Sequence, residues 1–360
     1  MVDRTAETDL YDGPVDARHL VKDGDLLFSW SATLAVDLWD RGPGVLNQHL
    51  FNVHPANGID KRWLRWGLLT SIPRFRTLMH GSAMTHITKE MLRDVALPVP
   101  SLDEQCCIAD FLDDHVALLD HAIKLRQQQI ALTEEHRRAV IANVMFAPGS
   151  KATKLGRLAH VELGRQRSPE HEEGDHLTPY LRSANVQDGE LLLEDVKEMN
   201  FTPAEQKVYA LALGDILVTE ASGSADAVGA TAVWQQQLPE VVCFQNTLIR
   251  VRPRLEGKYS SEYLAWWARA SHASGAMKVW ATGANILHLG SAGLRAMPVP
   301  VRSHPEQEVA VAACATVDQQ AQVLTRLHRK SLELLRERKE ALIAATVSGE
   351  IDVTTARSVA

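Results

Sequence analysis

The chain has 360 residues, with 45% hydrophobic and 23% charged residues and a formal net charge of −7. This length allows two or three domains, each able to bury its own core, and no apolar stretch approaches the roughly 20 residues that cross a bilayer. The negative charge argues against a protein that coats DNA regardless of sequence, because phosphate neutralisation drives such binding. We therefore expect a soluble, cytoplasmic protein with no membrane segment, in which any contact with nucleic acid is local.

The first 100 residues predict a mixed α/β domain. Short apolar runs at residues 26–28 and 50–53 are typical of strands and are bounded by turn residues. Residues 61–70 have helical spacing and are rich in tryptophan, which indicates a helix that packs on the core.

Residues 101–150 predict the first of two long helices. The stretch 103–147 contains neither Gly nor Pro, and its apolar residues recur at alternating steps of four and three, as in a coiled-coil seam. At 1.5 Å per residue such a helix would be about 65 Å long. The predicted seam is Leu112, Val116, Leu119, Ile123, Arg126, Ile130, Thr133, Arg137, Val140 and Val144.

The second half of the chain repeats the first. Residues 151–302 return to the α/β pattern, residues 303–350 predict the second long helix, and residues 351–360 form a tail. The predicted seam of this helix is Ala310, Ala313, Val317, Gln320, Leu324, Leu327, Ser331, Leu334, Arg338, Ala341 and Ala345. We expect an α+β fold: two α/β domains separated by two long antiparallel coiled-coil helices, with a pseudo-twofold internal repeat.

Short motifs recur about 200 residues apart and in the same order. A repeat of this length is a whole domain rather than a solenoid unit. The pairs are Gly24-Asp25-Leu26-Leu27 with Gly214-Asp215-Ile216-Leu217, Trp63-Leu64-Arg65-Trp66 with Tyr263-Leu264-Ala265-Trp266, Pro98-Val99-Pro100 with Pro298-Val299-Pro300, and Glu104-Gln105 with Glu306-Gln307.

Motifs for catalysis and for metal binding are weak in this sequence. It has no phosphate loop, no H-E-x-x-H and no G-x-S-x-G, and its four cysteines include no C-x-x-C pair. The acidic stretch 171–176 contains two histidines but lacks a further ligand at a sensible spacing, so a solvated loop is the simpler interpretation. Asp188, Asp195 and Lys197 faintly resemble the residues of a metal-dependent nuclease, yet the first copy has no counterpart. These absences favour a binding protein with no metal site.

Polar loops that follow the predicted strands are the best candidates for a binding surface. Asn and Gln can pair with adenine through two hydrogen bonds, and Arg, Ser, Thr and His also contact DNA. Each loop on its own could be an ordinary turn, but the same loop types recur at matching positions of the two copies. The first-copy candidates are Ser29, Ser31, Asn47, Gln48, His49, Ser82, Thr85 and His86, and the second-copy candidates are Arg165, Gln166, Arg167, Arg182, Ser183, Asn185, Ser222, Ser224, Gln245, Asn246, Thr282 and Asn285.

Taken together, the Gly-Asp strands, the amide-rich strand starts, the Pro-Val-Pro runs into Glu-Gln and the heptad helices resemble the specificity (S) subunit of type I restriction–modification systems. The likeness covers residues 23–352. It implies two target-recognition domains that read a split sequence in double-stranded DNA, held apart by the paired helices. It also implies two methyltransferase (M) subunits and motor-nuclease (R) subunits as partners. S-adenosylmethionine, ATP and Mg would serve those partners, so this chain would bind no cofactor and be non-catalytic.

Two further interpretations stay open beside the resemblance. A duplicated coiled-coil adaptor that binds proteins and not DNA would share the same architecture, and a stand-alone nuclease would use Asp188, Asp195 and Lys197. The first copy also lacks a counterpart of residues 155–190. We therefore expect the first recognition domain to be incomplete at its front and less stable, so that it reads its half-site weakly or not at all.

Overall fold

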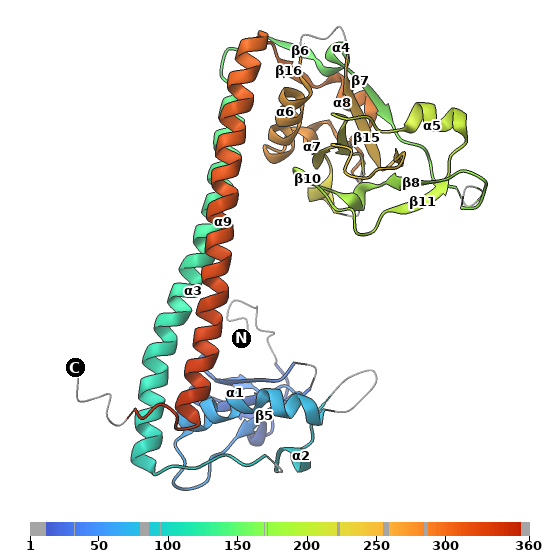
Figure 1. The fold of residues 1–360 in the computed structure, drawn as a ribbon. Coiled ribbons are helices and arrows are strands. Elements are labelled where there is room, and N and C mark those ends of the chain that lie inside the picture. Colours follow the sequence, from blue (N-terminus) through green and yellow to red (C-terminus); the bar gives the residue numbers. More distant parts are fainter. Residues whose placement is uncertain are drawn as a thin grey trace. The chain divides into compact units, whose positions relative to one another are not determined.

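The computed structural model describes residues 12–31, 33–79, 86–93, 95–168, 170, 172–221, 224–254, 259–283 and 287–353. The chain divides into two compact units (Figure 1). The first unit comprises residues 1–128 and 328–360, and the second comprises residues 129–327. Both long helices, α3 (Leu102–Met145) and α9 (His304–Val347), contribute to both units. Each unit therefore combines one α/β domain with part of each helix.

The α/β domain of the first unit is built on a small antiparallel sheet. Its strand order is β3-β2-β5, and β1 forms a separate antiparallel pair with β4. Helix α1 packs on this sheet and shares its apolar core. The elements are a 3-10 turn (Ala17–His19), β1 (Leu20–Val21), β2 (Leu26–Ser29), β3 (Ala35–Leu38), β4 (Gly44–Val45), β5 (Leu50–Val53), α1 (Lys61–Leu78) and α2 (Lys89–Arg93).

The domain of the second unit is larger and has two main sheets. One sheet is antiparallel with the order β13-β12-β15-β7, and the other has the order β11-β8-β14, in which β8 and β14 are parallel. The strands are β6 (Ala152–Lys154), β7 (Ala159–Leu163), β8 (Leu177–Leu181), β9 (Val186–Gln187), β10 (Glu190–Leu191), β11 (Lys197–Asn200), β12 (Ile216–Thr219), β13 (Thr231–Val233), β14 (Cys243–Phe244), β15 (Leu248–Pro253) and β16 (Pro298–Pro300). The helices are α4 (Leu155–Leu158), η3 (Ser183–Asn185), α5 (Pro203–Tyr209), η4 (Ala225–Ala227), α6 (Ser261–Ala273), α7 (Ala276–Trp280) and α8 (Ser291–Ala296).

The central strands and the main helix of the two domains correspond. β2, β3 and β5 match β12, β13 and β15 in order and in antiparallel pairing, and helix α1 matches α6. This correspondence confirms the internal repeat and the predicted α+β class, with two α/β domains and two long helices. Within the described part of the first unit, no strand corresponds to β7 or β8.

The repeated Gly-Asp motif is a turn that starts the central strand of each domain. Gly24 and Gly214 have φ angles of 82° and 88°, in the left-handed region that glycine adopts without a steric penalty. The carboxylates of Asp25 and Asp215 each accept a hydrogen bond from the backbone N–H three residues earlier, at 3.0 and 2.7 Å. The motif therefore fixes how β2 and β12 enter their sheets.

The tryptophans of the domain helices pack in the interior, as the sequence predicts. Trp63 and Trp66 are 1% and 2% exposed and lie in one apolar cluster with Leu112 of α3. Trp267 of α6 is 1% exposed, and Trp266 packs partly buried against the same core. In both domains these large side chains place the domain helix against a long helix.

A buried glutamine joins each domain helix to the start of a long helix. Gln105 of α3 accepts a hydrogen bond through Oε1 from the backbone N–H of Asp60, the residue that caps α1, at 2.8 Å. Gln307 of α9 accepts the equivalent bond from Ser260, which caps α6, at 3.0 Å. Both glutamines are 1% exposed, so the repeated Glu-Gln motif is a structural joint.

The two long helices run antiparallel. In the first unit Asp120 of α3 pairs with Lys339 of α9 at 2.6 Å. In the second unit Thr325 of α9 donates to Glu134 of α3 at 3.3 Å. Residue numbers rise along α3 while those of the partners fall along α9, as antiparallel pairing requires.

The predicted seam is correct for α3 but wrong for most of α9. Beyond Val317, the buried residues of α9 lie one position after the predicted ones. Ala321 and Thr325 are each 5% exposed, whereas the prediction had Gln320 and Leu324. Leu324 and Leu327, by contrast, are 47% and 61% exposed. A search for apolar spacing selects these leucines, whereas the inner face of α9 carries polar residues that hydrogen-bond to α3.

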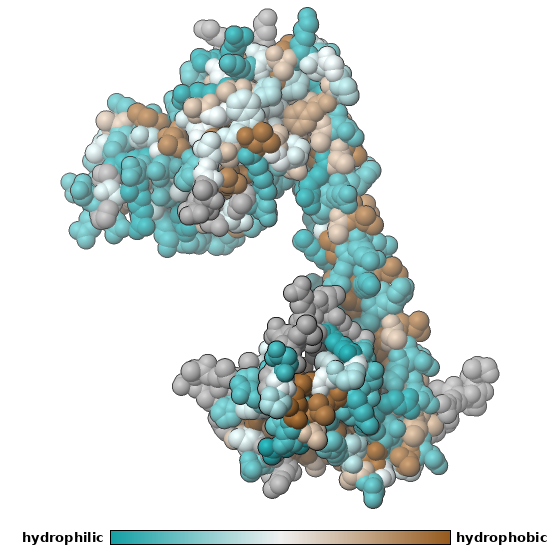
Figure 2. Space-filling view, turned by 180° about the vertical axis from the view of Figure 1, so that it is seen from behind, coloured by the Kyte–Doolittle hydropathy of each residue, from teal (hydrophilic) through white to brown (hydrophobic). Residues whose placement is uncertain are grey.

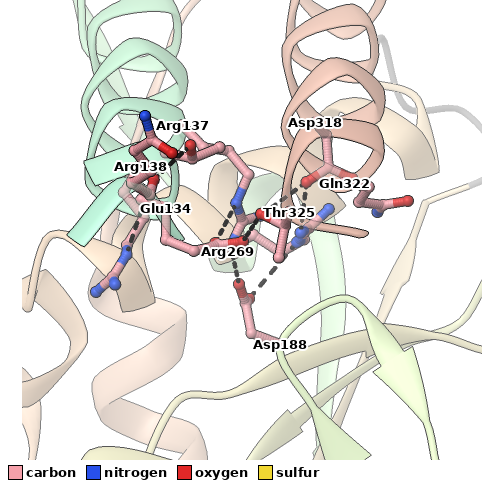
Figure 3. A network of polar contacts seen from close by, with 10 residues as sticks. Glu134, Arg137, Arg138, Asp188, Arg269, Asp318, Gln322 and Thr325 are labelled. Atoms are coloured by element: carbon pink, nitrogen blue, oxygen red, sulfur yellow. Dashed lines mark hydrogen bonds and ion pairs between the residues drawn. The ribbon is translucent and has the colours of Figure 1, made fainter. Parts of the chain in front are cut away.

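A cluster of charged residues ties the helix pair to the domain within the second unit (Figure 3). Asp318 of α9 accepts hydrogen bonds from Arg137 of α3 at 2.7 Å and from Arg269 of α6 at 3.1 Å. The same two guanidinium groups face Asp188, in the turn between β9 and β10, at 3.7 and 3.5 Å. None of the four side chains is more than 25% exposed.

The environment of Arg137 favours its charged form. Burial alone would lower the pKa of its guanidinium, but the hydrogen bond to Asp318 and the charges of Glu134, Asp318 and Asp188 raise the pKa above its ordinary value. Arg269 also lies over the Trp266 ring, 4.4 Å from the ring centre. Arg137 therefore keeps its charge, and the cluster connects α6 with both long helices within the second unit.

No helix in the described part of the chain is both long enough and apolar enough to span a membrane. His171 lies outside the described residues, and no three His, Cys, Asp or Glu side chains within the described ranges gather as a metal site would require.

We expect Gln307→Ala to lower the free energy of unfolding of the second unit by about 1–3 kcal/mol, because the N–H of Ser260 and the carbonyl of Arg302 lose their buried partner. Denaturant unfolding of the full chain checks this, with Gln320→Ala on the exposed face of α9 as the matched control. Equal stability of the two variants would show that Gln307 is not a joint.

We expect Asp318→Ala to destabilise the second unit by about 3 kcal/mol, since removing one partner of a largely buried ion pair leaves charge uncompensated. Arg137 and Arg269 both lose their closest carboxylate in this variant. Hydrogen exchange in α6 is the measurement, and Glu135→Ala on the exposed face of α3 is the control. Unchanged protection of α6 in the Asp318 variant would contradict the assigned role.

Candidate nucleic-acid interface

In the second unit, the loops that follow β7, β8 and β12 meet at the start of β15. The backbone oxygen of Thr247 accepts a hydrogen bond from the N–H of Glu220 at 2.9 Å, and its Oγ1 accepts one from the N–H of Ser183 at 3.0 Å. An isolated bridge pairs Gln245 with Arg165. Segments far apart in sequence therefore form one polar edge.

A fourth segment joins this edge through His288. It forms isolated bridges with Ala221 and with Thr282, and its Nδ1 lies 3.2 Å from Oε2 of Glu220. The N–H of Leu289 donates to the carbonyl of Glu220 at 2.9 Å. Glu220 and His288 therefore connect the loop after β12 with the segment before α8.

The first unit brings the corresponding loops together in the same way. The N–H of Trp30, after β2, donates to the carbonyl of His49 at 3.2 Å, as Glu220 does to Thr247. Ser31 forms a bridge with His86, as Ala221 does with His288. The two copies share this loop geometry although the side chains differ.

The amides at the strand starts are the best-placed candidates for reading bases. Gln245 and Asn246 are partly exposed, and no hydrogen bond of either side-chain amide occurs within the described residues. Their backbone N–H groups are fixed by bonds to Leu181 and Arg165 at 2.8 and 2.9 Å. Anchored backbones with unoccupied amides suit contact with base edges.

In the first unit, Asn47 and Gln48 are exposed at the same place. Oδ1 of Asn47 accepts a hydrogen bond from the N–H of His49 at 2.9 Å, and Nδ1 of His49 lies 2.9 Å from Oγ of Ser31. Ser29 donates weakly to the carbonyl of Ser31 at 3.5 Å. Ser31 is 6% exposed, so its hydroxyl is a buried partner that fixes the His49 ring.

Two predicted contact residues of the second unit serve the fold instead. Arg165 is 8% exposed, donates to the carbonyl of Asn200 and pairs with Glu205 at 2.9 Å. Asn185 is 2% exposed and donates to the carbonyls of Leu192 and Asp195 at 2.8 and 3.1 Å. Neither side chain is placed to reach a ligand in this arrangement.

Two other arginines pair with carboxylates that are more than half exposed. Arg167 pairs with Glu172 at 2.6 Å, and both side chains are more than half exposed. Arg182 pairs with Asp195 at 2.5 Å, where Asp195 is 65% exposed. An exposed pair such as Arg167–Glu172 contributes little to stability, so Arg167 can exchange its carboxylate for a phosphate at small cost. Arg182 is itself 24% exposed, but its partner Asp195 is mostly exposed.

The remaining predicted residues divide by position. Gln166, Ser224 and Thr282 are exposed, and Ser183 and His86 are partly buried. Those outside the described residues are Ser82, Thr85, Ser222 and Asn285.

Sequence reasoning missed three residues that organise the edge: Trp30, Thr247 and His288. Trp30 stacks on Phe51 with ring centres 5.7 Å apart and donates through Nε1 to the carbonyl of Gln48 at 3.2 Å. The signal was present, since His86 and His288 occupy matching positions in the repeat.

The faint nuclease set is not assembled in this structure. Asp188 faces Arg137 and Arg269, whereas Asp195 pairs with Arg182 and, at 3.3 Å, with Lys197. The two carboxylates thus have separate partners and separate structural roles.

Comparison with known families gives a match over the first third of the chain. Residues 16–132 match the type I restriction modification DNA specificity domain. That range contains the loop cluster of the first unit and most of helix α3.

Two curated relatives are specificity subunits of type I restriction enzymes. That of StySPI from Salmonella potsdam is 27% identical over 207 residues, which cover 57% of this chain and 42% of that protein. That of EcoKI from Escherichia coli strain K12 is 25% identical over 192 residues, which cover 50% of this chain and 41% of that protein. The chain thus matches less than half the length of either relative.

Solved structures show the same fold. A chain of a type I R-M system, studied for its complex assembly and conformational transition, has a TM-score of 0.75 at 16% identity, covering 92% of this chain and 83% of that one. The HsdS subunit from Thermoanaerobacter tengcongensis has a TM-score of 0.55 at 18% identity, covering 94% and 84%.

The motif order, the family match and the shared fold agree with one another. Over residues 16–132 the chain resembles the type I restriction modification DNA specificity domain, and its fold is that of the HsdS subunit and of the type I R-M chain.

Proposed function

We propose that the chain reads DNA sequence for a type I restriction–modification complex, one loop cluster per unit facing one part of a split target. The observation that carries this proposal is the repeated loop geometry, in which Trp30–His49 and Glu220–Thr247 form the same hydrogen bond. A duplicated scaffold that keeps its loops in register while varying their side chains suits two different sequences on one duplex.

Within this proposal, Gln245 and Asn246 contact base edges in the second unit. Asn47 and Gln48 are their counterparts in the first unit and read more weakly, because no described strand there corresponds to β7 or β8. Arg167 and Arg182 contact phosphates after leaving Glu172 and Asp195. The net charge of −7 means that local cations, or basic partner subunits, supply the electrostatic attraction.

Exposed apolar residues on the long helices support a role in assembly. On α3, Leu118, Leu125 and Leu132 recur every seven residues and are 68%, 44% and 62% exposed. On α9, Leu327 and Leu334 have the same spacing and are 61% and 52% exposed. Figure 2 shows apolar side chains on the surface of this helical part. Such stripes suit helices of partner proteins.

We propose methyltransferase and motor-nuclease subunits as those partners. The chain is then non-catalytic, and S-adenosylmethionine, ATP and Mg bind to the partners. The complex acts in the cytoplasm, where the DNA of the cell is accessible.

The second candidate is a coiled-coil adaptor that binds proteins without reading DNA. The exposed leucines of α3 and α9 favour it as strongly as they favour a restriction complex. The loop clusters distinguish the two, because an adaptor has no need for two matched sets of anchored polar side chains.

The test is selection of duplex DNA by the full chain with its co-purifying partners, comparing Gln245→Ala, Asn246→Ala and Arg167→Ala. Each amide variant should lose about 1–3 kcal/mol of discrimination at one position of the site. The arginine variant should weaken binding to all sequences and reduce the salt slope by about 0.9. Gln320→Ala on the exposed face of α9 is the control. Unaltered sequence preference in both amide variants would contradict the assigned surface, and binding of protein partners without DNA would favour the adaptor.

A further inference from the structure

Among the described strands, the sheet of the first unit ends at β5, whereas the sheet of the second unit continues from β15 to β7. β15 lies between β12 and β7, whereas β5, its counterpart, pairs with β2 alone among the described strands. An unpaired strand edge exposes backbone donors and acceptors that can pair with another polypeptide.

A second strand position of this unit is also unfilled by any described strand. β14 has β8 as a parallel neighbour, and the N–H of Leu211 donates to the carbonyl of Val242 just before β14. In the first unit, Val21 of β1 pairs with Gly44 of β4 and so matches the contact between Leu211 and Val242. A counterpart of β8 is missing from the described strands of this unit. Within the described part of the first unit, the positions of both β7 and β8 are therefore without a strand.

The groups at the open edge follow from the pairing register. Because Trp30 donates to the carbonyl of His49 and β2 pairs Phe28 with Phe51, alternate residues of β5 bond to β2. The backbone of Leu50 and Asn52 is therefore directed outward. In the second unit, the outward carbonyl of Leu248 accepts a bond from Gly164 at 3.1 Å.

A hollow of about 470 Å³ lies along this edge and is lined by residues including Arg18, Val45, Leu46, Leu50, Asn52 and His54. Oδ1 of Asn52 is buried and has no hydrogen-bond partner within the described residues. A buried acceptor without a donor costs free energy, so a donor from an occupant would satisfy it.

We propose that this edge binds an extended segment of a partner polypeptide, antiparallel to β5 and in the register of β7 on β15. The side chains expected of the occupant follow from the interface between β7 and β15 in the second unit. There Glu162 stands opposite Arg250 and pairs with it, while the apolar Val161 stands opposite Val251. In the first unit Asn52 replaces Arg250, so the occupant carries a side-chain donor, such as Gln, where β7 carries Glu162.

Binding would also complete the loop cluster of the first unit, a consequence that rests on the proposed function. In the second unit the chain leaves β7 through Gly164, where a side chain would collide with the backbone of Gln245, and continues to Arg167. If an occupant binds in the same register, the residues that follow its strand lie beside Asn47. A second copy of this chain is a less suitable occupant, because its β7 is already paired with β15.

The probe is a synthetic peptide with the sequence of residues 155–168, in native form, with Glu162→Gln and with Glu162→Pro. Single-residue hydrogen exchange on the full chain should show slowing at Asn52 with the first two peptides. Phe51 and Val53 already bond to β2 and should not change. The Gln peptide should bind about fivefold more tightly than the native one, as one added hydrogen bond predicts. The Pro peptide removes a ladder donor and should have no effect.

Asn52→Ala in the chain should abolish the preference for the Gln peptide but keep binding of the native one. Protection of the Asn52 amide in the free chain equal to that of Phe51 would overturn the proposal, because the edge would already be covered. Protection that rises with chain concentration in parallel with dimer formation would overturn it in favour of a second copy. Equal effects of the Pro and Gln peptides would show that no strand forms. None of these readouts involves DNA, so their failure leaves the proposed function standing.

Discussion

Asp318 lies where three elements of the second unit meet, and we expect the position of the polar loop edge to depend on this contact. It accepts from Arg137 of α3 and Arg269 of α6 while it stands on α9. Apolar packing alone would allow the domain to slide or turn on the helix pair, because it is not directional. A charged hydrogen-bond cluster of low exposure restricts the arrangement to one geometry, since any other leaves charge unpaired. Under the proposed function such restriction matters, because contact geometry decides which base edges the loops reach.

The first unit solves the same problem with different residues. Arg62 pairs with Asp110 of α3 at 2.8 Å, and Trp66 donates through Nε1 to Asp113 at 3.0 Å. The buried Gln105 occupies the same joint as its counterpart in α9. The duplication has thus kept the backbone-directed features, namely the glycine turn, the glutamine joint and the loop register. It has changed the charged side chains, which is what allows two units with one fold to meet different surroundings.

Sequence alone predicted the features that depend on local chemistry. The strand at residues 26–28 and the helix that buries Trp63 follow from residue type and spacing. The roles of Arg165 and Asn185 did not follow, because an arginine or an amide in a polar loop has the same local signature whether it faces a ligand or the backbone of a neighbouring strand. The prediction of the inner face of α9 was wrong for a related reason. Exposed leucines such as Leu327 imitate a seam, and only the tertiary partners of the polar residues reveal the true one.

Site-specific photo-cross-linking to DNA tests most directly whether the loop clusters are the reading surface. The cross-linking residue would replace Asn246, at the loop edge, or Leu213, which is 72% exposed and precedes the opposite end of β12. With the full chain and its co-purifying partners on a pool of duplex sequences, our account predicts cross-links from position 246 that concentrate on one short sequence. It predicts none above background from position 213. Equal cross-linking from both positions, or sequence-independent cross-linking from position 246, would contradict it.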